Sequence, residues 1–170
     1  MSFINAEQTN LAKKIAALLT AAGETLAVSE SSSGGLVSAC LLSVPGASSY
    51  FVGGSVLYSY KIRKQIVEMG KKEHQQYGGS TPELILDIAM KFKEKTGTDW
   101  VIGEGGAAGP SKSPYGHNAG YTALAVAGPI CRTKIIETGK SDRIENMSEF
   151  TTGLLSFFAS VLEERAGKKE

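Results

Sequence analysis

The chain has 170 residues, a length that suits one domain with a real core and is short for two. Apolar residues make up 42% of the chain and charged residues 21%, a composition typical of a soluble globular protein. A formal net charge of +1 excludes the broad positive field that draws nucleic acid or anionic membranes to a protein, so we expect neither as a partner.

Signals for a metal centre, secretion or membrane insertion are missing as well. Cys40 and Cys131 stand far apart outside any CxxC pattern, and His74 and His117 lack the spacing of metal ligands, so we expect no protein metal site. The N-terminus lacks the basic and apolar regions of a signal peptide, and no apolar run is as long as a membrane span. We therefore expect a cytoplasmic protein.

Apolar periodicity and capping residues predict helices that alternate with strands. Asn5, Thr81 and Asp142 are the expected N-caps, and Gly23 ends the first helix. The expected elements are a helix over 5–23, a strand over 25–29, a helix over 34–43, a strand over 52–59, a helix over 61–69, a polar connector to 79, a helix from 81, a strand over 100–102, a loop over 104–118, strands over 121–127 and 130–138, and a helix from 142.

This order of elements predicts an α/β fold, with helices on both faces of a mixed, mostly parallel sheet. Gly128-Pro129 joins the last two strands as an antiparallel hairpin. We expect a single domain over residues 1–170, with a charged tail at 166–170 that frays.

The turn Ser31-Ser32-Ser33-Gly34-Gly35 lies between a predicted strand and a predicted helix. Unpaired backbone N–H groups at a helix start favour an anion, and the hydroxyls include a candidate nucleophile. An ordinary serine cap explains the same residues, and the motif alone slightly favours that reading. However, the second glycine-rich loop also follows a strand, and ligands of α/β sheets gather where strand ends meet such loops. This coincidence favours a binding or catalytic site.

Four segments together carry a family resemblance through their order and spacing. They are Ser29-Glu30-Ser31-Ser32-Ser33-Gly34-Gly35, the stretch 43–59 with its Val-Pro-Gly-Ala and Gly-Gly-Ser-Val-Leu-Tyr motifs, Gly106-Ala107-Ala108-Gly109-Pro110, and Ser141-Asp142-Arg143. The chain resembles the CinA C-terminal domain family, the nicotinamide mononucleotide deamidases, from about residue 8 to residue 162. The resemblance implies a three-layer α/β/α sandwich that commonly self-associates, so a homo-oligomer is expected, without a cofactor. It also implies hydrolysis of the nicotinamide mononucleotide carboxamide to the acid and ammonia.

The resemblance implies a catalytic serine at Ser31 and a catalytic tyrosine at Tyr58, while the family's catalytic lysine falls on Arg63. A serine needs a neighbouring base, and an arginine does not deprotonate in proteins, so Arg63 would instead hold a phosphate or a developing oxyanion. Lys61 and Lys64 share a helix face that is turned about 100° from Arg63, and a solvated role is favoured for both. His117 is a further candidate base, although its place in a loop favours an exposed histidine without a catalytic role.

The expected ligand contacts come from the two glycine-rich turns and from the start of the last helix. They are Ser32, Ser33, Gly34, Gly35, Gly105, Gly106, Ala107, Gly109 and Arg143. Two functions stay open: an amidohydrolase that acts on a nicotinamide nucleotide, and a catalytically impaired relative that binds a nucleotide or phosphate ligand. A scaffold whose glycine loops only build an oligomer interface ranks third.

Overall fold

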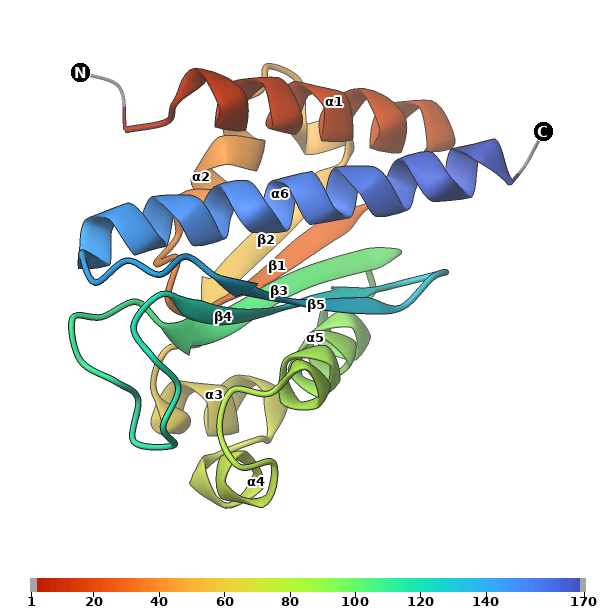
Figure 1. Ribbon diagram of the computed structural model, residues 1–170. Helices are drawn as coiled ribbons and strands as arrows, with labels where there is room; N and C mark the ends of the chain where they lie inside the picture. The colour runs from red at the N-terminus through yellow and green to blue at the C-terminus, as the bar shows by residue number, and fades with distance from the viewer. Residues whose placement is uncertain (1–2, 169–170) are drawn as a thin grey trace.

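The middle layer of the protein is a five-stranded sheet (Figure 1). In the computed structural model, which describes residues 3–168, its strands are β1 (Leu26–Glu30), β2 (Phe51–Val56), β3 (Trp100–Ala107), β4 (Tyr121–Ala127) and β5 (Arg132–Glu137). They lie in the order β2-β1-β3-β4-β5. β1 pairs in parallel with β2 and β3, whereas β4 runs antiparallel to both of its neighbours. Four strands therefore share one direction, and the predicted α/β class and the hairpin are confirmed.

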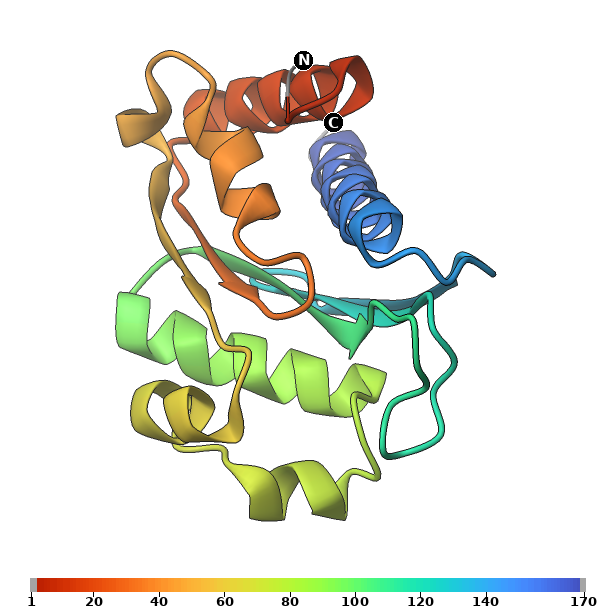
Figure 2. The same ribbon diagram turned by 90° about the vertical axis from the view of Figure 1, so that its left-hand side faces the viewer.

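Helices cover both faces of the sheet and make the outer layers of the sandwich (Figures 1 and 2). One face carries α1, α2 and α6, and the other carries α5 with α3 and α4 beyond it. Their bounds are α1 (Ala6–Ala22), α2 (Leu36–Leu42), α3 (Tyr60–Val67), α4 (Lys71–Gln76), α5 (Pro82–Thr96) and α6 (Arg143–Gly167), with a short 3-10 turn at Ala47–Ser49. Among the described residues, no helix combines the length and the apolar character that a membrane crossing requires.

Each strand of the sheet centre supplies apolar side chains to both outer layers because side chains alternate along a strand. In β3, Trp100 and Ile102 join the core under α1 and α6, whereas Val101 between them joins the core under α5. β1 divides its residues in the same way, with Leu26 on one side and Ala27 on the other. Both faces of the central strands are therefore covered by helices. This fixes the strand register, because a slip of one residue would move every side chain to the opposite face.

The three predicted N-caps are confirmed. The side chains of Asn5, Thr81 and Asp142 each accept the backbone N–H three residues further along. Gly23 ends α1 in the left-handed conformation with φ 66°, where a residue without Cβ is not strained.

Several boundaries differ from the prediction; β2, for example, ends at Val56 and not at residue 59, so Tyr58 lies beyond the strand. The polar connector contains α4, whose start is stabilised because the Glu73 carboxylate accepts the Gly70 N–H at 2.7 Å. β3 continues to Ala107, so the expected loop begins later than residue 104. α6 extends to Gly167, so Ala166 and Gly167 are helical rather than part of a frayed tail, while residues 169–170 lie outside the described part of the chain.

Candidate active site

The anion expected at the serine turn is supplied by the protein itself. β1 and β3 are neighbours, and this brings Glu30 and Glu104 next to the turn. Glu104 Oε1 accepts the backbone N–H groups of Ser31 at 2.7 Å and Ser33 at 2.8 Å. Glu30 Oε2 accepts the N–H of Gly35 at 2.9 Å. A ligand anion would have to displace these carboxylates, so the turn's amides do not form an open anion site.

The hydroxyls of Ser32 and Ser33 are engaged in the same network. Ser32 is 5% exposed and donates to Glu104 Oε2 at 2.7 Å. Ser33 is fully buried, and its oxygen lies 2.8 Å from Glu30 Oε2 and 2.9 Å from Glu104 Oε1, so its single proton serves both carboxylates. The polar groups of Ser33 and Gly35, two of the expected ligand contacts, are therefore engaged by carboxylates of the protein itself.

Ser31 differs from the two serines that follow it. Its hydroxyl has no hydrogen-bond partner within residues 3–168, and its side chain lines a cavity of about 350 Å³. Tyr58, Arg63 and Gly106 line the same cavity. We call this space the Ser31 cavity. The fold thus brings the three expected catalytic positions beside one glycine-rich loop.

A second cavity of about 260 Å³ adjoins the Ser31 cavity and shares Tyr58, Gly106, Ser113 and Pro114 with it. We call it the outer cavity. Among its other lining residues are Ser32, Ala107, Gly109, Lys112 and Arg143. Arg143 donates to the Gly109 carbonyl at 2.7 Å and to the Tyr58 hydroxyl at 3.3 Å. The start of α6 therefore holds the glycine loop and the exposed tyrosine together.

Gly105 and Gly106, which lie in the last part of β3, have mainly packing roles. A Cβ on Gly105 would lie 2.6 Å from Ile85 Cδ1, and one on Gly106 would lie 2.6 Å from the Thr122 Cα and still nearer the Tyr121 carbonyl. Gly34 borders neither cavity, and a Cβ there would meet Met147 at 2.9 Å. Gly34 and Gly105, two further expected ligand contacts, are thus closely packed and line neither cavity.

Arg63 is a buried cation on the wall of the Ser31 cavity. It is 4% exposed; its Nη1 lies 2.9 Å from His74 Nδ1, and its Nη2 donates to the Leu57 carbonyl at 3.5 Å. Its Nε has no partner within the described residues. Burial lowers the pKa of Arg63 below its usual range, and burial followed by the Arg63 charge lowers the pKa of His74 to about 4. His74 is therefore neutral near pH 7 and accepts a hydrogen bond from the guanidinium.

None of the alternative bases lines the Ser31 cavity. Lys61 and Lys64 are exposed, as the helical rotation predicts, and Lys64 Nζ donates to the Glu68 carbonyl. His117 stacks on Tyr121 with ring centroids 4.0 Å apart, outside both cavities. These three residues therefore do not contact Ser31 from their present positions.

Among the cavity side chains that were not singled out from the sequence, two are basic residue types, His74 and Lys112. His74 appears isolated in the chain, and only the packing of α4 against α3 brings it beside Arg63. Lys112 lies in a loop whose glycines and prolines hide any periodic signal. A basic residue inside a glycine-rich loop that follows a strand is the signal that points to Lys112.

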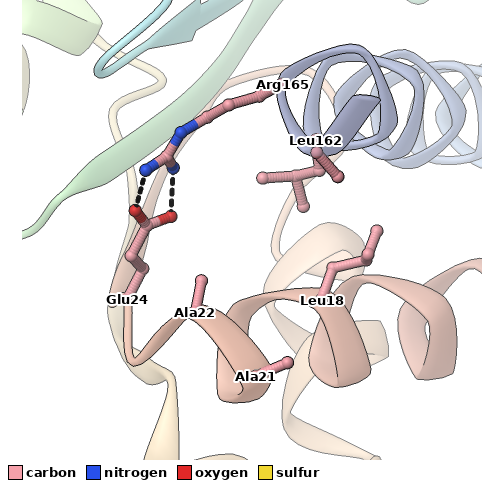
Figure 3. Close-up of a pocket in the computed structure, with 7 residues that line it drawn as sticks. Leu18, Ala21, Ala22, Glu24, Leu162 and Arg165 are labelled. Atoms are coloured by element: carbon pink, nitrogen blue, oxygen red, sulfur yellow. Dashed lines mark hydrogen bonds and ion pairs between the residues drawn. The ribbon is translucent and has the colours of Figure 1, made fainter. Parts of the chain in front are cut away.

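Another hollow lies between α1 and α6, at the opposite end of β3 from Gly106. This apolar groove of about 310 Å³ is lined by Leu18, Ala22 and Leu162 and is closed by the ion pair of Glu24 with Arg165 (Figure 3). Trp100, the first residue of β3, donates to the same Glu24 at 2.7 Å. The groove shares no lining residue with the Ser31 cavity and contains no candidate nucleophile.

Comparison with known proteins identifies the family. The sequence model of the CinA C-terminal domain matches residues 8–162. The chain belongs to the CinA C-terminal domain family. A CinA-like protein of Parasynechococcus marenigrum (strain WH8102) is 35% identical over 120 residues, which cover 71% of this chain and 29% of the relative. One from Prochlorococcus marinus (strain MIT 9313) is 34% identical over 72% of this chain. This CinA-family chain thus spans less than a third of the length of these relatives.

Solved structures of CinA proteins share the fold. The competence/damage inducible protein CihA from Agrobacterium tumefaciens superposes with a TM-score of 0.86 at 21% identity, covering 96% of this chain and 99% of that one. A CinA superfamily protein from Enterobacter cloacae gives a TM-score of 0.85 at 22% identity, covering 91% and 92%. At this identity the likeness establishes the three-layer fold of the CinA domain and leaves its chemistry to the residues of the site.

Proposed function

We propose that this CinA-family domain is an amidohydrolase that converts nicotinamide mononucleotide to its acid form and ammonia. The observation that carries this proposal is the free hydroxyl of Ser31. It is the one hydroxyl of the Ser31–Ser33 run without an internal partner among the described residues, and it lines the same cavity as Tyr58. A nucleophile must be free of structural hydrogen bonds and accessible to its substrate, and Ser31 meets both conditions.

The reaction balances with Ser31 and Tyr58 as the groups that act on the substrate. Ser31 Oγ forms a bond to the carboxamide carbon while its proton passes through Tyr58 to the amide nitrogen, the C–N bond breaks, and ammonia leaves. Water then hydrolyses the acyl ester, which releases the acid and restores the serine hydroxyl. Arg143 donates to the Tyr58 oxygen, so the phenolic proton stays available for donation.

A second candidate function is a ligand-binding relative without turnover. Arg63 stands where the resemblance implies a lysine base, and no lysine lines the Ser31 cavity. A fixed cation does not take the serine proton, whereas it binds an anionic ligand well. We propose this binding role as the alternative, on the strength of the Arg63 position.

One experiment separates the two candidates. The purified full chain is incubated with nicotinamide mononucleotide and ammonia is measured, beside Ser31→Ala and the exposed control Ser160→Ala. Release by wild type and by the control, but not by Ser31→Ala, supports the amidohydrolase. Saturable binding by calorimetry without ammonia supports the binding role. A result with no turnover and no binding contradicts both candidates. It leaves the third function, a scaffold whose glycine loops only build an oligomer interface.

A further inference from the structure

Arg63 is a buried charge without a counter-ion. It is 4% exposed, and no carboxylate of the described residues lies within ion-pair distance of it. Its hydrogen-bond partners are a neutral histidine and a backbone carbonyl. A buried cation loses its favourable hydration, and this loss destabilises the protein unless an anion compensates it. Because Arg63 lines the Ser31 cavity, the compensating anion can come from a ligand.

The guanidinium keeps donors free for such an anion. Nη1 contacts His74, Nη2 reaches the Leu57 carbonyl only at 3.5 Å, and Nε is unpaired. Nε and one Nη make the edge with which an arginine binds a carboxylate through two parallel hydrogen bonds. A void of about 10 Å³ beside Arg63 and Ser31 is also lined by Glu30 and Glu104, whose carboxylates the serine turn engages, so a ligand carboxylate meets Arg63 from the Ser31 cavity and not from this void.

The opposite end of the connected space is also cationic. Lys112 and Arg143 line the outer cavity, and no acidic side chain lines either cavity. Between the two cationic ends lie Tyr58, Pro114 and Tyr115, whose flat faces suit an aromatic ring. The space therefore matches a ligand with a planar ring and two separate anionic groups, one at each end.

We infer that this site prefers a pyridine mononucleotide with a ring carboxylate over the one with a ring carboxamide. The inference rests on the proposed function, which supplies the class of ligand, a pyridine mononucleotide. It adds that the form with the ring carboxylate is bound more tightly. The phosphate lies toward Lys112 and Arg143, and the ring carboxylate pairs with Arg63. A carboxylate accepts from both arms of the guanidinium, whereas a carboxamide of the same shape has one acceptor oxygen and turns an NH2 group toward the cation. The domain thus holds the acid, the product of the proposed reaction, more tightly than the amide.

Calorimetric titration of the full chain with nicotinamide mononucleotide and with nicotinic acid mononucleotide tests the inference, at one fixed ionic strength. All proteins in this titration, including the one with wild-type Arg63, carry Ser31→Ala, so that the amide is not converted to the acid during the measurement. We expect the protein with wild-type Arg63 to bind the acid at least about tenfold more tightly, the usual gain of a charge-assisted pair over a neutral one. Arg63→Met removes the charge and should bring the ratio of the two dissociation constants close to one. Lys64→Met, an exposed change on the same helix, should leave the ratio unchanged.

Each outcome decides something different. Equal affinities, or tighter amide binding by the protein with wild-type Arg63, overturn the carboxylate preference and leave the proposed site standing. An unchanged ratio in a folded Arg63→Met protein also overturns it. Binding of neither nucleotide contradicts the proposed function itself. Circular dichroism checks that the variants fold. If Arg63→Met does not fold, the ratio of the two dissociation constants measured with wild-type Arg63 still decides the question.

Discussion

The backbone N–H of Ser31 donates to Glu104 Oε1 at 2.7 Å, although 73 residues separate the two along the chain. This bond ties the turn after β1 to the neighbouring strand β3. The same carboxylate accepts the Ser33 N–H and the Ser32 hydroxyl. Glu104 therefore fixes the backbone of the turn. It makes no hydrogen bond with the Ser31 hydroxyl, and the Ser31 side chain lines the Ser31 cavity.

Replacement of Glu104 by glutamine should destabilise the fold. One carboxylate oxygen becomes an NH2 group that faces hydroxyl and N–H donors, and buried donors without an acceptor cost roughly 1–3 kcal/mol each. We expect Glu104→Gln to lower the free energy of unfolding by about 3 kcal/mol in urea titration. The matched control Glu94→Gln changes an exposed carboxylate and should stay within about 0.5 kcal/mol of wild type. Equal stability of the two variants would contradict the structural role of Glu104.

A methyl group on Gly106 should disrupt the pairing of β3 with β4. The added Cβ would lie 2.6 Å from the Thr122 Cα, and backbone atoms cannot move aside as a flexible side chain can. We expect Gly106→Ala to cost about 3 kcal/mol or more of unfolding free energy. Gly167→Ala, near the end of α6, has open space around it and should be neutral or slightly stabilising. Thermal unfolding of both variants provides the comparison, and a Gly106→Ala melting temperature equal to that of wild type would show that the strands can separate locally.

His74 should make stability depend on pH between about 4 and 6.5. Its pKa is about 4 in the folded protein and near 6.5 in the unfolded chain, so the unfolded state takes up the proton first as the pH falls. The contribution of neutral His74 is complete above pH 6.5 and is lost as the pH falls to about 4, in total about 3 kcal/mol. The free energy of unfolding of wild type and of His74→Gln is measured at pH 7, 5.5 and 4. The difference between the two proteins cancels the titrations of all other groups, which both share. Parallel stability curves would refute the prediction.

Loss of Arg143 should weaken ligand binding more than it weakens the fold. Arg143 is exposed, yet it connects the Gly109 carbonyl with the Tyr58 hydroxyl and lines the outer cavity. We expect Arg143→Ala to raise the dissociation constant of a pyridine mononucleotide about tenfold, with a change in unfolding free energy below about 1 kcal/mol. Arg132→Ala removes another exposed arginine, which pairs with Glu164 away from both cavities, and should leave binding unaltered. An unchanged dissociation constant in Arg143→Ala would exclude this residue from the site.

Local signals in the sequence determined the order and the type of the elements. N-caps such as Asn5 and Thr81 act on residues three positions away, and the apolar period of a helix is written within a few turns, so both can be read without the fold. The rotation of Arg63 away from Lys61 and Lys64 follows from the same helical geometry, and the structure confirms it by burying the arginine alone among the three.

The tertiary structure alone decided what fills the serine turn and what surrounds Arg63. Glu104 reaches the turn only because β1 and β3 pair, and His74 reaches Arg63 only because α4 packs near α3. The extension of β3 through Gly105 and Gly106 depends likewise on the close approach of β4. Contacts of this kind join residues that are far apart along the chain, so their partners carry no local pattern, and only the packed sheet brings them within hydrogen-bond distance.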